Sequence, residues 1–264
     1  MFYYPQLTSG SVSQYPVARA MNLRTITNQM LGGDTIRAFD SGAGTVRWQL
    51  QYAGLTDAEW SSIDQLFEAV EGQLTTFTFL DPTDNLLLWS EDWTQAPWVA
   101  DPLIALAGGI ADPLGATNAM QITNTAQTTQ RVMQPTGGPS EFQYALSVYL
   151  KADAPCTIDL AVSTTGQDWT APVNVGTRWA RASVSVALST TQDGVHFGIQ
   201  LPAGFRVYAF GAQVEAQLAA GPYKKTIDLA GVYSTARFDS DSLSRISTAP
   251  NQNSGVVKLM SELA

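Results

Sequence analysis

Short segments that alternate apolar and polar residues dominate the chain after Asn85, and they constrain its fold more than any other feature. The clearest runs from Glu141 to Ala152 ("EFQYALSVYLKA"). Four more follow, separated by turns rich in glycine, aspartate and threonine: "CTIDLAVSTTG", "RWARASVSVAL", "VHFGIQL" and "FRVYAFGAQVE". A period of two is that of a half-buried strand, and this region has no convincing helix. The pattern predicts a two-sheet β-sandwich or jelly roll.

The first eighty residues combine strands with one strong helix signal. Residues 45–55 alternate as a half-buried strand does. Thr56 and Glu59 then have the spacing of a capping box, and Gly72 is the expected left-handed stop. The apolar face of this helix is expected to consist of Trp60, Ile63, Leu66, Phe67 and Val70. The pattern predicts a helix between Thr56 and Gly72.

Three further features of this region concern strands and turns. The segment from Leu74 to Phe79 predicts another strand, which Asp81-Pro82 ends. The glycines of "GGD" (32–34) and "SGAG" (41–44) are expected in hinges or turns, because neither has the spacing of a phosphate-binding loop.

After Tyr223 the sequence pattern again resembles that of the first eighty residues. "TARFDSDSLSRIS" and "GVVKLMSEL" are strand candidates, but two strands and a turn cannot fold alone. Residues 81–222 hold five Lys/Arg against twelve Asp/Glu, a charge of −7, while the remaining residues hold nine against eleven, a charge of −2. We therefore expect one domain of residues 1–84 plus 223–264, interrupted by an inserted domain of residues 85–222.

Charge and composition exclude several classes of function. The negative insert disfavours nucleic acid, and no apolar run is long enough for membrane insertion. The N-terminus has no secretory-signal pattern, so synthesis in the cytoplasm is expected. His196 is the only histidine and Cys156 the only cysteine, and both fit structural positions in strands. Glu91 and Asp92 are adjacent and cannot form a glycosidase pair on a strand. No catalytic residue is assigned, and we expect no enzyme.

Two segments carry a resemblance to a known fold family. "NLLLWSEDWTQAPW" (85–98) and "VYAFGAQVEAQLAAGPYKKT" (207–226) resemble the opening and closing strands of carbohydrate-binding-module-like jelly rolls found in phage tail and fibre proteins. The matching positions of the first segment are Asn85, Leu86, Leu87, Ser90, Glu91, Asp92, Trp93 and Trp98. Those of the second are Gly211, Ala212, Gln213, Glu215, Pro222 and Tyr223. The resemblance implies a fold, and a fold alone does not identify a ligand.

The flanking segments resemble distal tail proteins of long-tailed phages and gene transfer agents. The resemblance rests on the capped helix followed by "GQLTTFTFLDPTD", and on "ARFDSDSLS" with "VVKLMSEL". It implies a split-barrel-type module that forms a hexameric ring at the tail tip and contacts the tail tube and the tail hub. The implied location is the virion, after synthesis in the cytoplasm of the bacterial host.

Candidate binding residues follow from the jelly-roll resemblance and from side-chain chemistry. Aromatic side chains can stack on sugar rings, and the candidates are Trp169, Trp179 and Tyr208, with the sandwich core or rim as the alternative. Similar jelly rolls often hold a structural calcium, for which Glu91, Asp92 and Glu215 are candidate ligands. The alternative, acids in contact with water, is favoured, so no cofactor is expected.

The combined prediction is a virion structural protein with a peripheral domain that binds a host-surface glycan. A free carbohydrate-binding protein is the first alternative, and a tail-associated glycan hydrolase the second. The tryptophan cluster is expected where one domain meets the other. Trp93 and Trp98 are predicted to be core or edge residues of the jelly roll's first strand and loop, and Trp89 is predicted to pack at the junction.

Overall fold

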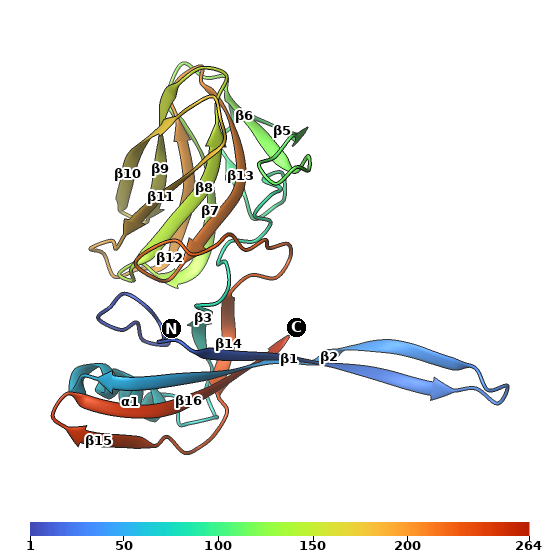
Figure 1. Cartoon of the computed structure of the whole chain (residues 1–264), viewed down its shortest axis with the longest axis vertical. Helices are drawn as coiled ribbons and strands as arrows, with labels where there is room; N and C mark the ends of the chain where they lie inside the picture. The colour runs from blue at the N-terminus through green and yellow to red at the C-terminus, as the bar shows by residue number, and fades with distance from the viewer. Residues whose placement is uncertain (264) are drawn as a thin grey trace. The chain divides into compact units, whose positions relative to one another are not determined.

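The computed structural model describes residues 1–263 and divides the chain into two compact units (Figure 1). The flanking unit consists of Met1–Thr8, Ser13–Phe79 and the chain from Tyr233 onward. The sandwich unit consists of Ser9–Val12 and Leu80–Val232. The described residues form sixteen strands and one α-helix, which confirms the predicted mainly β fold. Independent folding is a separate property, so the two predicted domains stay a prediction.

The flanking unit is built on one sheet of six strands. Their order is β1-β2-β16-β14-β3, and β15 pairs with β16. The strands are β1 (Val17–Gln29), β2 (Thr35–Leu55), β3 (Phe77–Leu80), β14 (Val232–Phe238), β15 (Arg245–Ala249) and β16 (Gln252–Leu263). The strand predicted at 45–55 is the second half of β2, and the closing candidates are β14, β15 and β16. Leu74 was expected in a strand, but it lies before β3 and is 68 % exposed.

Helix α1 (Asp57–Ala69) forms where its capping pattern predicts it. The Thr56 hydroxyl accepts a hydrogen bond from the Glu59 amide (3.2 Å), and Glu59 Oε2 accepts one from the Thr56 amide (2.9 Å). After the helix, Glu71 and Gly72 both have positive φ, and the Gly72 amide donates to the Phe67 carbonyl (3.0 Å). The capping box and the stop are therefore both present. Trp60 is fully buried and packs on Gly255 of β16, where a Cβ atom would overlap its ring.

Aromatic residues fill the core of the flanking unit. Trp48 makes edge contacts with Phe79 and Tyr233, at ring-centre distances of 5.0 and 4.6 Å. Phe238 contacts Phe67 and Phe77 at 5.0 and 5.2 Å. These rings join β2, β3, β14 and α1, which are far apart in the sequence, into one core.

A long hairpin of β1 and β2 is the feature of this unit that the sequence analysis did not predict. Residues 24–29 pair with residues 35–40, whereas β16 reaches only as far as Gly44 along β2. The hairpin therefore continues as a two-stranded ribbon beyond the rest of its sheet (Figure 1). The "GGD" glycines lie in its turn as expected, but the "SGAG" segment lies inside β2, so its assignment to a turn is wrong.

The sandwich unit contains two five-stranded sheets. One has the order β10-β9-β12-β7-β4 and the other β11-β8-β13-β6-β5. The first sheet is made of β4 (Val99–Ala100), β7 (Gln130–Pro139), β9 (Cys156–Thr164), β10 (Gln167–Val175) and β12 (Asp193–Leu201). The second is made of β5 (Ile104–Ile110), β6 (Ala119–Asn124), β8 (Tyr144–Lys151), β11 (Ala180–Val186) and β13 (Arg206–Glu215). The predicted β-sandwich is confirmed.

The segment 85–98 corrects one expectation, because none of its residues forms a strand. The buried Asn85 side chain forms hydrogen bonds to the backbone in place of the hydrogen bonds of a paired strand. Its Nδ2 donates to the Ala212 carbonyl (2.9 Å), and its Oδ1 accepts from the amides of Leu87 and Val214 (both 3.0 Å). Trp89 then has a φ of +49°, which interrupts any extended path. The segment is therefore a structured loop fastened to β13.

The same loop contains the tryptophan pair that was predicted to occupy core or edge positions. Trp93 stacks on Trp98 with ring centres 4.3 Å apart, and both side chains are buried. Their indole N–H groups donate to the carbonyls of Ser90 and Trp89 (3.3 and 3.1 Å). Of the two predicted kinds of position the structure shows the core, and the pair lies in the loop and not in a strand. Within the part of the chain that the structure describes, no helix is long and apolar enough to span a membrane.

Candidate functional site

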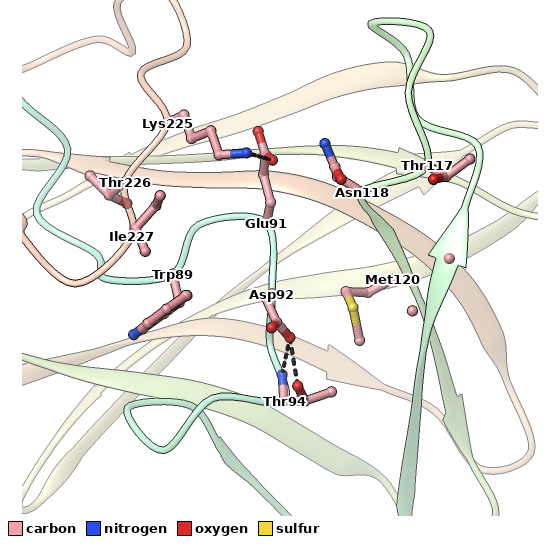
Figure 2. Close-up of a pocket in the computed structure, with 12 residues that line it drawn as sticks. Trp89, Glu91, Asp92, Thr94, Thr117, Asn118, Met120, Lys225, Thr226 and Ile227 are labelled. Atoms are coloured by element: carbon pink, nitrogen blue, oxygen red, sulfur yellow. Dashed lines mark hydrogen bonds and ion pairs between the residues drawn. The ribbon is translucent and has the colours of Figure 1, made fainter.

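A pocket of about 450 Å³ lies in the sandwich unit beside the loop of residues 89–94 (Figure 2). Three segments of the chain line it: this loop, the edge strand β5 with β6 and the two residues before β6, and residues 225–227. The lining residues are Trp89, Glu91, Asp92, Thr94, Gly108, Gly109, Thr117, Asn118, Met120, Lys225, Thr226 and Ile227. Aromatic, charged, amide and hydroxyl groups therefore converge on one cavity, which is the composition of a small-molecule site.

Trp89 is held against this pocket by backbone hydrogen bonds. Its amide donates to the Ile227 carbonyl (2.8 Å), and its carbonyl accepts from the Asp92 amide (3.1 Å) and from the Trp98 indole (3.1 Å). A positive φ is unfavourable for a bulky residue, so these contacts must offset a local backbone strain. The result is a half-exposed indole whose backbone is fixed by three neighbours.

Asp92 places an ionised carboxylate in the pocket. Its Oδ1 accepts from the amide and the hydroxyl of Thr94 (3.1 and 2.6 Å), and its Oδ2 accepts from Gln95 Nε2 (2.7 Å). Partial burial raises the pKa of Asp92, but these hydrogen bonds outweigh burial, and the pKa lies below its usual value. The group is therefore a fixed acceptor whose Oδ2 has remaining capacity for a ligand.

Glu91 lies at the rim, in a separate network with the closing segment of the unit. Its Oε2 pairs with Lys225 Nζ (2.5 Å), and its Oε1 accepts from the Tyr223 hydroxyl (3.1 Å). Burial raises the pKa of Tyr223 well above its usual value, and the nearby Glu91 carboxylate raises it further. The phenol therefore stays protonated as a donor. Lys225 compensates the charge of Glu91, which leaves Asp92 as the uncompensated charge among the lining residues.

The opposite wall comes from β5 and β6. Gly108 and Gly109 lie where the register of β5 shifts, and a Cβ atom on Gly109 would meet nothing within 4 Å. Asp112 orders the following loop, since its Oδ2 accepts from the Asn118 amide (3.1 Å). The Asn118 side chain is exposed and makes no hydrogen bond within residues 1–263. It therefore offers both a donor and an acceptor to a ligand.

The structure distributes the three candidate calcium ligands over different partners. Glu91 binds Lys225, Asp92 binds Thr94 and Gln95, and the buried Glu215 pairs with Lys224 Nζ (2.8 Å). Glu215 Oε2 also accepts from the Gly221 amide (2.7 Å). Among the described residues, no group of three or more acidic, histidine or cysteine side chains could hold a metal. Their role as calcium ligands stays a prediction.

The three candidate sugar-stacking residues do not share one surface. Trp169 of β10 pairs with the buried Val162 and therefore faces the interior of the sandwich. Tyr208 of β13 lies on the outer face of the other sheet, with Lys151 Nζ 5.6 Å from its ring centre and its hydroxyl bound to Asp153 (3.0 Å). Trp179 lies directly before β11 and is half-exposed. Their role in glycan binding stays a prediction.

Most of this pocket could not be predicted from the sequence. Trp89 was expected at a domain junction, and neither Asn118 nor Lys225 was expected in a site. The available signal was the tryptophan within an acidic, turn-forming loop ("WSEDWT"), but nothing local connects it with residues 118 and 225. His196 lies half-buried in β12, paired with Pro135 and Ser163, and does not line this pocket.

No protein-family model and no curated protein matches the sequence. Among solved structures, the CBM22-1 xylan-binding domain of Paenibacillus barcinonensis Xyn10C is 15 % identical, with a TM-score of 0.42 over 53 % of this chain and 99 % of that domain. The CBM22-1–GH10 modules of Clostridium thermocellum endo-1,4-β-D-xylanase 10B, complexed with xylohexaose, are 13 % identical, with a TM-score of 0.41 over 51 % of this chain. The match spans 28 % of that xylanase chain.

A third similar structure comes from a phage. The enzymatically active domain of bacteriophage CBA120 tailspike protein 4 is 9 % identical, with a TM-score of 0.36 over 52 % of this chain and 22 % of that one. At TM-scores this low, the similarities decide neither the ligand nor the role of this chain. The assignment of a β-sandwich rests on the two sheets described above.

Proposed function

We propose that the chain is a structural protein of a phage or phage-like virion, in which the flanking unit assembles into a ring at the distal end of the tail. In this proposal the ring connects the tail tube to the tail hub, and the sandwich unit binds a glycan of the host surface. The resemblance of the flanking segments to distal tail proteins supports the assignment. The observation that carries it is the exposed apolar ribbon at the end of the β1–β2 hairpin.

The ribbon comprises residues 23–40, and large apolar side chains are exposed along it and at its tip. They are Leu23 (58 %), Ile26 (45 %), Met30 (52 %), Leu31 (111 %), Ile36 (49 %) and Phe39 (63 %). A two-stranded hairpin on its own is only marginally stable in water, and clustered apolar surface of this kind marks a contact with another molecule. The ribbon therefore fits a segment that is covered after assembly.

A second copy of the chain is the occupant that we propose for the ribbon. Strand β1 is also the edge of its sheet, so its backbone is available to a neighbour along the same side. The ribbon projects from one side of the unit only, and a contact between such a projection and a different surface of the next copy is head-to-tail. A head-to-tail contact closes into a ring when its rotation permits. The low net charge of the flanking segments keeps repulsion between copies small.

Native mass spectrometry tests the ring directly. At tens of micromolar, alone or mixed with the neighbouring hub protein, the chain is expected to form a closed oligomer, hexameric in this proposal. Phe39→Asp places a charge on the ribbon and should shift the equilibrium to monomer, whereas Thr177→Asp adds the same charge to an exposed loop of the sandwich unit and should not. A native chain that stays monomeric even with the hub present would contradict the proposal.

A free carbohydrate-binding protein is the second candidate, and the pocket in the sandwich unit is the observation that favours it. Negative-stain images separate the two candidates, because rings support the first and isolated particles with glycan affinity support the second. A tail-associated hydrolase would instead shorten a capsule or peptidoglycan substrate, which a chain-length assay detects.

A further inference from the structure

We propose that the pocket beside Trp89 binds a neutral pyranose ring of a glycan, with the Trp89 indole as the stacking surface and the Asp92 carboxylate as the acceptor for sugar hydroxyls. The inference rests on the glycan-binding part of the proposed function and relocates the site from Trp169, Trp179 and Tyr208. It assigns a ligand class to a cavity of about 450 Å³, which lies within the usual range of small-molecule sites.

The apolar part of the pocket suits one face of a sugar ring. Trp89 is half-exposed, and Ile227, at 47 % exposure, lies next to it along the cavity. In the view of Figure 2, Trp89 and Met120 lie on either side of Asp92. An aromatic surface beside a hydrogen-bonding group is what a pyranose requires, because its C–H face is apolar and its edge carries hydroxyls. The fixed backbone of Trp89 also limits the entropy lost on binding.

The polar part of the pocket suits the hydroxyl edge. A sugar hydroxyl both donates and accepts, so the site must supply both functions. Asp92 accepts, the Asn118 amide group donates and accepts, and the Thr117 hydroxyl is exposed on the same wall. Figure 2 shows Asn118 and Thr117 along the side of the pocket formed by β6 and the loop before it. The glycines at 108–109 leave this wall free of side chains that would fill the cavity.

The charge of the pocket disfavours anionic sugars. Lys225 neutralises Glu91 through their ion pair, so the ionised Asp92 gives the lining a net negative charge. Residues 81–222 carry −7 in total, which adds a repulsive field for any polyanion at low salt. Neutral glycans are therefore preferred over sulfated, phosphorylated or uronic acid polymers.

The experiment uses the full-length protein on an array of neutral oligosaccharides built from glucose, galactose and N-acetylglucosamine, alongside sulfated and phosphorylated polymers. The strongest neutral ligand is then titrated by calorimetry against native protein and variants. We expect a dissociation constant of roughly 1 mM per site for such small contacts. Trp89→Ala and Asn118→Ala should each weaken binding, the first by about tenfold or more.

Two controls distinguish lost contacts from lost folding. Phe142→Ala removes a half-buried aromatic side chain elsewhere in the same unit, outside the pocket and outside the candidate stacking residues, and should leave the affinity unchanged. Asn118→Ala should keep the native melting temperature, because its side chain makes no hydrogen bond within residues 1–263. Loss of affinity in this variant therefore reports a contact with the ligand.

The outcomes separate this inference from the proposed function. Neutral-glycan binding that survives both pocket variants, or that is lost only with Trp169→Ala, Trp179→Ala or Tyr208→Ala, overturns the pocket and leaves glycan binding in place. Binding of polyanions alone, or of no glycan at millimolar concentration, overturns both the pocket and the glycan-binding function. Ring formation is measured independently by native mass spectrometry.

Discussion

Replacing Asn85 with alanine should destabilise the sandwich unit more than any exposed substitution in it. The Asn85 side chain is fully buried and bonds to four backbone groups. Three of these bonds are buried, to the Ala212 carbonyl and the amides of Leu87 and Val214, and a half-buried one goes to the Lys224 carbonyl (3.3 Å). Truncation leaves the three buried groups without that partner. Each such group costs about 1–3 kcal/mol, so the loss should be at least about 3 kcal/mol.

This loss should be visible as a lowered melting temperature. For a unit of this size, about 3 kcal/mol corresponds to a decrease of roughly 6–12 °C. Calorimetry resolves the transition of the sandwich unit, and circular dichroism of the stacked Trp93–Trp98 pair reports the same loop. Asn118→Ala is the matched control, because it removes the same atoms from an exposed position. If both variants melt within about 1 °C of the native protein, the Asn85 hydrogen bonds do not hold the loop on β13 in place of strand pairing, and the prediction is refuted.

Three further predictions concern the rest of the chain. Gly255→Ala should destabilise the flanking unit by about 1–3 kcal/mol in a denaturant titration, because the added Cβ overlaps the Trp60 ring. Partial burial raises the pKa of Glu59, but hydrogen bonds from Thr8 and Thr56 outweigh it and lower that pKa to about 2. The stabilisation of the fold by ionised Glu59 is fully present above the unfolded-state pKa of about 4.3 and is lost as the pH falls towards 2. Glu59→Gln should therefore flatten the dependence of stability on pH in that window. Replacing residues 85–222 with a short Gly/Ser linker should leave a folded flanking unit, and the excised segment should also fold, as measured by circular dichroism. A stable 1–222 fragment beside an unfolded deletion variant would contradict the insertion.

Local sequence determined the elements whose stabilising contacts lie a few residues apart. The α1 capping box needs only Thr56 and Glu59, three residues apart, and both hydrogen bonds are present. The strand at 45–55 follows from alternation, since Val46, Trp48, Leu50 and Tyr52 are buried and the residues between them are not. The five predicted sandwich strands also form, although β8 and β13 are buried on both faces. For Trp93 and Trp98 the sequence left core and edge positions open, and the tertiary structure placed both in the core.

Only the tertiary structure decided the ribbon, the form of the opening loop and the pocket. Residues 18–29 of β1 are exposed throughout, so no buried face marks them as a strand, and pairing with β2 holds them. The segment after Asn85 is a loop because the Asn85 side chain bonds to β13, more than a hundred residues later in the chain. The pocket joins Trp89, Asn118 and Lys225 from three distant segments. Such contacts depend on which strands pair and where a loop is fastened, and the residues within one short window of sequence do not encode that choice.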